Sequence, residues 1–221
     1  MLRNFTKRYH PSEAWLYDRV VAPAVATLAA QVQAELGRDL PERGEVLEVG
    51  SGGGQLALAM VAARPGVRWL GVDLSPEQVA RASRRARGHE ARVRFMTGDA
   101  AELAFEASRF DAVVSVASIK HWPDPARGLR ECARVLRPGG RLLVAEVDRG
   151  CRYHDARDFV RRWRLPPGGW PFALALFRTF VAGRSLDCDE ARALAAELPL
   201  SESRVSRIAG TPAFLLAGRK R

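Results

Sequence analysis

The stretch VLEVGSGGGQ, from Val46 to Gln55, constrains the fold more than any other part of the sequence. A short apolar run leads directly into four glycines within five residues, and glycine weakens regular elements because it loses the most backbone freedom on folding. Glu48 lies two residues before the first of them, Gly50. Such a loop is typical of the turn between a buried strand and a helix whose N-terminus meets a ligand, because bare backbone allows close approach.

After the glycines, short apolar runs alternate with helical patterns, which is typical of βαβ units around a parallel sheet. We expect strands at residues 45–49, 68–72, 92–96, 110–116 and 140–147, and helices at 55–63, 76–86 and 125–136. Near the C-terminus, SESRVSRIAG and TPAFLLAGRK predict two strands joined by a tight turn. The sequence therefore predicts an α/β fold whose sheet is mostly parallel and ends in an antiparallel hairpin.

Composition narrows the class of protein. The chain has 221 residues and three cysteines that form neither a metal-binding pair nor a disulfide framework, which favours a reducing cytoplasm. No apolar stretch is long enough to span a bilayer, and no cluster of Asp, Glu and His indicates a divalent metal. The net charge of +10 comes almost entirely from arginine and is spread along the chain, which argues against a nucleic-acid partner.

Three carboxylates lie at the ends of the expected strands. Glu48 is on the first strand, Asp73 ends the second in LGVDLS, and Asp99 follows the third in TGDAAEL. A dinucleotide fingerprint needs a glycine where Gln55 stands, and a negative charge beside the loop disfavours a diphosphate. The set suits a nucleoside joined to a cationic amino acid. Each residue also has a structural alternative: a salt bridge to a helix for Glu48, a helix cap for Asp73 and a turn for Asp99.

The ordered motifs VLEVGSGGG, GVDLS, TGDAAEL, FDAVVSVASIKHWPDP and LRPGGRLLVAE resemble those of class I S-adenosylmethionine-dependent methyltransferases. They are similar in particular to the small-molecule branch that includes ubiquinone- and menaquinone-biosynthesis enzymes. The resemblance implies a Rossmann-like, doubly wound sheet of seven strands, S-adenosyl-L-methionine as the cofactor and no metal. It implies cofactor contacts for Glu48, Gly50, Ser51, Gly52, Asp73, Leu74, Asp99, Ala100 and Val116.

The same resemblance implies which part of the cofactor each of these residues contacts. Asp73 would hold the ribose, and Asp99 would meet the edge of the adenine. Glu48 would anchor the glycine loop and reach the amino group of the methionine part through water. Val116 would offer a backbone carbonyl.

The acceptor side is expected around His121, in SIKHWPDP just past the fourth strand. Its imidazole titrates in the range useful for a general base, so it is the expected catalytic residue; alternatively, it only forms a wall of the pocket. In related enzymes the N-terminal segment folds over the cofactor as a lid, and the region after the fifth strand caps the substrate pocket. The expected substrate contacts are therefore Tyr9, Tyr17, His121, Trp122, Tyr153 and Trp170. The aromatic residues after the fifth strand favour an apolar, aromatic or lipid-like acceptor.

These observations divide the chain into segments: an N-terminal helical lid at 1–40, a cofactor-binding core at 41–148, a helical substrate cap at 149–200 and a hairpin at 201–221 that completes the sheet. The preferred hypothesis is a cytoplasmic, monomeric or homodimeric methyltransferase that modifies O, N or C of a small organic molecule. One alternative is an RNA or protein methyltransferase. Others are a protein that binds the cofactor for different chemistry, and an NAD-dependent oxidoreductase, which Gln55 and Glu48 oppose.

Overall fold

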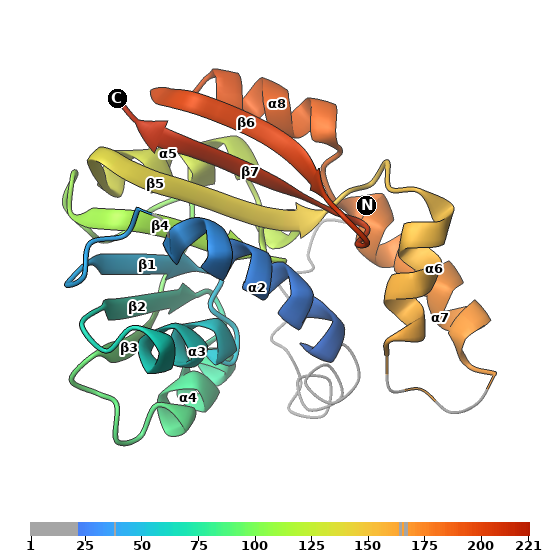
Figure 1. The fold of residues 1–221 in the computed structure, drawn as a ribbon, viewed down its shortest axis with the longest axis horizontal. Helices are drawn as coiled ribbons and strands as arrows, with labels where there is room; N and C mark the ends of the chain where they lie inside the picture. The colour runs from blue at the N-terminus through green and yellow to red at the C-terminus, as the bar shows by residue number, and fades with distance from the viewer. Residues whose placement is uncertain (1–21, 38, 164, 166–167) are drawn as a thin grey trace.

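The computed structural model describes residues 22–221 except 38, 164 and 166–167. Its centre is a seven-stranded sheet in the order β3-β2-β1-β4-β5-β7-β6 (Figure 1). The strands are β1 (Glu45–Val49), β2 (Arg68–Asp73), β3 (Val93–Thr97), β4 (Phe110–Val116), β5 (Leu136–Val147), β6 (Leu200–Ile208) and β7 (Ala213–Lys220). β1 to β5 run parallel, and β7 lies antiparallel between β5 and β6. The predicted fold class is confirmed.

Helices cover both faces of this sheet. Those that pack on it are α2 (Ala22–Gly37), α3 (Gln55–Ala63), α4 (Pro76–Arg85), α5 (Pro125–Val135) and α8 (Cys188–Ala196). Because side chains alternate along a strand, each strand contributes to two separate cores. Val46 packs with residues of α2 and α3, whereas the next residue, Leu47, packs with residues of α5 and α8. This double burial explains why the strands are apolar throughout.

The main difference from the sequence prediction lies at the start of β5. The Pro-Gly-Gly sequence predicts a turn before residue 140, but the strand already begins at Leu136, which pairs with Phe110. The register then shifts, and Gly139 adopts a left-handed φ of 77°, so these residues form an irregularity within the strand. Pro23 lies in the first turn of α2, where proline is tolerated. The other expected strands and helices end within two residues of the observed bounds.

A helical lobe follows β5 at the carboxyl edge of the sheet. It contains α6 (Tyr153–Arg161), α7 (Trp170–Leu176), the π-helical turn η2 (Phe177–Val181) and the 3-10 turn η3 (Ala182–Arg184). Residues 152–184 are called the cap lobe below. Figure 1 shows α6 and α7 projecting beyond the sheet, whereas α8 packs against β6 and β7. None of the helices in the described part of the chain is long and apolar enough to cross a membrane.

Candidate active site

A cavity of about 920 Å³ opens at the carboxyl ends of the parallel strands. Every residue expected to contact the cofactor lines it: Glu48, Gly50, Ser51, Gly52, Asp73, Leu74, Asp99, Ala100 and Val116. His121 and Trp122 also line it, together with aromatic residues of the cap lobe. The topology thus brings the strand-end carboxylates and the loop after β4 (Val116–Ser118) into one enclosed space, as expected at the carboxyl edge of an open α/β sheet.

The glycine loop is held to the neighbouring strand by its main chain. The N–H groups of Gly50 and Ser51 donate to the carbonyl of Val72, at 2.7 and 3.0 Å. Gly50 has a φ of +78°, and a Cβ at this position would lie 1.8 Å from Oγ of Ser118. Only glycine therefore fits between β1 and the loop after β4. The loop ends at Gly54, which precedes the first turn of α3.

Asp73 connects the glycine loop to the start of α4. Its Oδ2 accepts a hydrogen bond from the N–H of Gly52 at 2.8 Å, and its Oδ1 accepts one from the N–H of Ser75 at 2.9 Å. Burial raises the pKa of Asp73, and these two hydrogen bonds oppose the shift. The N-cap of α4 is Ser75, which accepts from the N–H of Gln78. Asp73 therefore acts at the start of this helix only by way of Ser75, whose N–H it binds. Each carboxylate oxygen retains a lone pair for a ligand hydroxyl.

Glu48 is a buried acid at the inner end of the cavity. Glu48 is only 3% exposed, and its Oε2 accepts a hydrogen bond from Nε1 of Trp69 at 2.8 Å. Burial raises the pKa of Glu48 to about 8; the Trp69 hydrogen bond opposes this shift, and the charge of Asp73 adds to it. Among the described residues no cation forms a salt bridge with Glu48, so its partner is an indole rather than a helix cation. The carboxyl group is suited to ionising when a cation arrives.

Asp99 shapes its own turn. Its Oδ1 accepts a hydrogen bond from the N–H of Ala101 at 2.8 Å, and its carbonyl accepts one from the N–H of Glu102 at 3.1 Å. The turn role considered for this residue is therefore confirmed. Asp99 also lines the cavity, so a contact with a ligand is compatible with that role and stays a prediction.

His121 ends the 3-10 turn η1 (Ile119–His121), just past β4. The residue is accessible because it lines the open cavity. The protein around the cavity nevertheless buries the imidazole from most of the bulk water. This burial lowers the pKa of His121 to about 4; the charges of Lys120 and Arg184 lower it further, while Glu146 opposes them. The imidazole is therefore neutral at pH 7. It can accept a proton, but with less driving force than an ordinary histidine.

A buried ion pair supports the turn that carries His121. Nζ of Lys120 lies 2.9 Å from Oε1 of Glu146, and the two side chains are 9% and 0% exposed. Nζ also donates to the carbonyl of Ala117 at 2.6 Å, and Ala117 has a left-handed φ of 54°. Glu146 was not among the residues expected from the sequence. The signal was there, because Glu146 is an acid inside the apolar run RLLVAEV, and buried acids are almost always paired.

Aromatic rings of the cap lobe form the other end of the cavity. Phe159, Trp163 and Phe177 line it, with ring centroids 5.4 to 6.3 Å apart. Two of the expected substrate contacts lie elsewhere: Tyr153 is 57% exposed beneath Arg178, and neither Tyr153 nor Trp170 lines the cavity. Because the cavity lining does not include Tyr153 or Trp170, their contact with a substrate stays a prediction. Sequence reasoning missed Phe159, which only the fold places beside Phe177.

Two further expected substrate contacts, Tyr9 and Tyr17, lie outside the described residues. Trp122 is buried at the cavity wall, and its Nε1 donates to Oγ of Ser118 at 3.1 Å. The remaining predicted contact on this side, His121, lines the cavity beside it. The turn η1 and the residue after it therefore contribute two neighbouring rings, His121 and Trp122, to the cavity wall.

Comparison with known proteins agrees with this site. The profile of a family described as "Methyltransferase domain" matches residues 47–144, which contain the glycine loop, the three carboxylates and His121. Residues 47–144 therefore match a methyltransferase domain, and relatives named as quinone-biosynthesis methyltransferases match the chain over 101 and 104 residues. The predicted resemblance to the branch that includes quinone-biosynthesis enzymes is confirmed by these relatives.

Two of those relatives indicate how far the similarity extends. A demethylmenaquinone methyltransferase of Thermus thermophilus is 39% identical over 101 residues, 46% of either chain. A 2-methyl-6-phytyl-1,4-hydroquinone methyltransferase of Oryza sativa is 38% identical over 156 residues, 69% of this chain and 43% of the relative. The chain thus spans less than half the length of these relatives. A solved S-adenosylmethionine-dependent methyltransferase of Aquifex aeolicus shares the fold, with a TM-score of 0.68 at 16% identity over 96% of this chain and 100% of that one.

The charge of the cavity fits S-adenosylmethionine, the cofactor named for similar solved structures. The described lining includes the carboxyl groups of Glu48, Asp73 and Asp99, while the one lining residue that is a permanent cation, Lys120, is neutralised by Glu146. Negative charge attracts a sulfonium and an ammonium group and repels the diphosphate of a dinucleotide. Glu48, with its pKa of about 8, adds to this charge only when it ionises beside a cation. In the described part of the chain, no group of three or more His, Cys, Asp and Glu could hold a metal ion.

Proposed function

We propose that this methyltransferase transfers the methyl group of S-adenosylmethionine to a small, largely apolar organic molecule. The proposal is supported by a single cavity with two chemically different ends. Glu48 and Asp73 provide carboxyl groups at one end, and the rings of Phe159, Trp163 and Phe177 make the other end apolar. A cationic cofactor and an apolar acceptor would therefore meet in one enclosed space.

The chain's main task would be positioning. The cofactor supplies an electrophilic methyl group, and holding an acceptor atom in line with it accounts for much of the rate in such displacements. The glycine loop and Asp73 would fix one partner, and the aromatic end of the cavity would orient the other. His121 would accept the proton of an acceptor hydroxyl as a general base. Its pKa of about 4 makes it a weak base, so positioning would contribute more than proton transfer.

For the acceptor we propose an aromatic ring that carries hydroxyl or keto groups. Relatives are named for demethylmenaquinone and for a phytyl hydroquinone, and the rings around Phe177 would stack on an acceptor of this kind. The proposal covers O, N and C as the methylated atom. The cytoplasmic location and the monomeric or dimeric state stay predictions from the sequence.

Calorimetric titration tests the cofactor half of the proposal. We expect S-adenosylmethionine and its demethylated product to bind and NAD not to bind, because the carboxylates repel a diphosphate. Heat on adding NAD, with none from either sulfur compound, would refute the proposal. Binding without methyl transfer to any acceptor would instead support the alternative of a protein that keeps the cofactor for other chemistry.

Methyl incorporation into a panel of demethylated quinols and phenols tests the acceptor half. If His121 is a base, His121→Ala should slow turnover about 10²–10⁴-fold and leave cofactor affinity unchanged. His89→Ala, which alters an exposed histidine outside the cavity, is the matched control. An unchanged rate for His121→Ala would mean that His121 lines the pocket without acting as a base.

A further inference from the structure

The cap lobe presents an apolar stripe to solvent. Phe172, Leu176 and Phe180 are 71%, 40% and 53% exposed. They follow one another at intervals of four residues along α7 and η2, about one helical turn each, so they share one side. On the inner side of the same segment, Leu174 and Phe177 are buried. A helix that is apolar both where it packs and where it does not is normally covered by something other than water.

The cap lobe is also strongly basic. Residues 152–184 contain seven arginines, two aspartates and no lysine or glutamate, a net charge of +5 within a chain whose total is +10. Both aspartates already have partners within α6, His154 and Arg157. Arg161 and Arg178 lie over the rings of Trp170 and Tyr153 and form no ion pair with a described residue. The charge of the lobe is therefore available to an anionic surface.

The stripe leads into the active-site cavity. Phe180 belongs to both, because it lines the cavity and is half exposed. Arg184 lies over the ring of Phe180 at 5.5 Å from its centroid, at the inner end of the stripe. Figure 1 shows α6 and α7 extending beyond the edge of the sheet, so the sheet does not cover the lobe. An apolar path thus runs from the outer end of α7 to the place where an acceptor would bind.

We propose that the cap lobe docks on an anionic lipid surface. Phe172, Leu176 and Phe180 would enter the boundary between headgroups and acyl chains, and the arginines would contact lipid phosphates, as in other interfacial helices. An apolar acceptor dissolved in the bilayer would then reach the cavity along the stripe without crossing water. Only this last consequence rests on the proposed function; the docking itself needs neither cofactor nor acceptor.

Vesicle flotation tests the apolar half of the proposal. We expect the full chain to float with vesicles of equal parts phosphatidylglycerol and phosphatidylcholine, and not with phosphatidylcholine alone. Phe172→Ser combined with Leu176→Ser should lower the partition coefficient about tenfold or more, because two apolar side chains leave the interface. Both positions are exposed and outside the cavity lining. The melting temperature and calorimetric cofactor affinity of this variant should stay at wild-type values.

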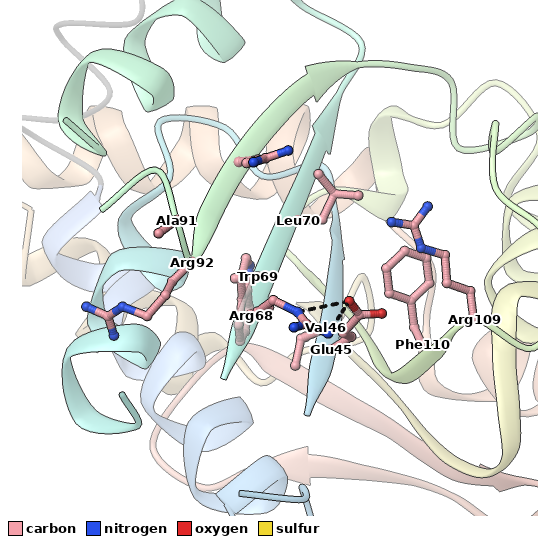
Figure 2. A pocket seen from close by; sticks show the side chains of 10 residues that line it. Glu45, Val46, Arg68, Trp69, Leu70, Ala91, Arg92, Arg109 and Phe110 are labelled. Atoms are coloured by element: carbon pink, nitrogen blue, oxygen red, sulfur yellow. Dashed lines mark hydrogen bonds and ion pairs between the residues drawn. The ribbon is translucent and has the colours of Figure 1, made fainter. Parts of the chain in front are cut away.

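The test of the arginines needs a control variant that loses the same positive charge elsewhere on the protein. The opposite edge of the sheet provides the arginines for it. A cleft of about 260 Å³ there is rimmed by Arg68, Arg92, Arg94 and Arg109 (Figure 2). Figure 2 shows Arg68 bonded to Glu45 and Arg109 beside Phe110, with which it stacks. Arg161→Ser with Arg178→Ser should weaken flotation, whereas Arg94→Ser with Arg109→Ser, which removes the same charge, should not.

Four results would overturn the docking proposal. The wild-type chain could stay unbound to anionic vesicles at low salt, or the Phe172→Ser, Leu176→Ser variant could float as well as wild type. The two arginine variants could lose flotation equally, which would mean adsorption through net charge alone. Finally, light scattering without lipid could show that the wild-type chain is a dimer and that the Phe172→Ser, Leu176→Ser variant is a monomer. A second copy of the chain would then cover the stripe. A wild-type chain that floats with anionic vesicles but transfers no methyl group to any acceptor would instead contradict the proposed function.

Discussion

The two ends of the cavity are built from different parts of the chain. At the cofactor end, main-chain groups make the contacts: the N–H groups of Gly50 and Ser51 bond to the next strand, and that of Gly52 bonds to Asp73. At the acceptor end, side chains define the space, through the Lys120–Glu146 pair and the rings of the cap lobe. Backbone geometry is encoded locally by glycine, whereas side-chain clusters combine residues far apart in the sequence. Substitutions at the two ends should therefore have different effects: a loss of cofactor binding at one end and a loss of stability at the other.

Breaking the buried ion pair should have the largest effect, and the effect should be on stability. Glu146→Gln leaves the ammonium of Lys120 buried without a counter-charge, which should lower the free energy of unfolding by about 3–5 kcal/mol. Urea denaturation measures the change. Asp189→Asn breaks the exposed pair with Arg192 and should cost less than about 1 kcal/mol. Equal losses in the two variants would contradict the view that side chains hold the acceptor end together.

Gly50→Ala should damage the cofactor end by about 2–4 kcal/mol of binding free energy, from strain and overpacking. The new Cβ would lie 1.8 Å from Oγ and 2.4 Å from Cβ of Ser118. Titration with S-adenosylmethionine measures the loss, and the added change Ser118→Gly should restore part of it. Gly139→Ala is the control, because φ is +77° there but nothing lies within 4 Å. Normal binding by Gly50→Ala would show that the loop is not built around bare backbone.

Asp73→Asn should weaken cofactor binding by about 1.5–3 kcal/mol, the worth of a hydrogen bond to a charged group. The amide keeps the shape of the side chain but places an N–H group opposite the N–H of Gly52 or of Ser75, both of which donate to the present carboxylate. Asp111→Asn, which changes an acid at the amino edge of the sheet that accepts from the N–H of Glu45, is a matched control. Unchanged affinity in Asp73→Asn would mean that the ribose is held elsewhere.

Glu48 should couple cofactor binding to pH. Its pKa of about 8 lies above the usual 4.5, so a cation that needs the ionised carboxylate should bind more tightly as pH rises, by up to about tenfold per unit below that pKa. Because folding raises the pKa, the stabilisation from the protonated group is fully present below pH 4.5 and is lost as pH rises through about 8. Titration in buffers of different ionisation enthalpy should detect proton release, and Glu48→Gln should abolish it. Proton uptake would contradict this account.

His121 should have the smallest pH effect. Because its pKa is lowered from 6.5 to about 4, the ring stays neutral throughout the physiological range, and turnover should change less than about twofold between pH 6 and 9 through this residue. Its contribution to stability is present above pH 6.5 and is lost as pH falls through about 4. Rate profiles of wild type and His121→Ala locate the acidic limb. A limb near pH 6.5 that vanishes in the variant would show that the cavity does not exclude water from the ring.

Local sequence patterns predicted the cofactor end well. The glycine loop, the carboxylates at successive strand ends and the terminal hairpin each depend on residues close together in the chain, so short motifs carried the information. The start of β5 was wrong for the same reason: the Pro-Gly-Gly signal marks a turn locally, yet pairing with Phe110 holds Leu136 in the strand. Tyr153 and Trp170 do not line the cavity, because aromatic composition does not tell which side of a helix faces inward.

The sequence by itself determined the order of strands and helices, the position of the bare glycine backbone and the carboxylates beside it, because periodicity and spacing are properties of neighbouring residues. Only the tertiary structure decided which side chains meet across the chain. It paired Lys120 with Glu146, placed Phe159 against Phe177 and left Phe172 exposed on the outer side of α7. It also set the pKa values of Glu48 and His121, because burial and distant charges depend on the whole fold rather than on the residue type.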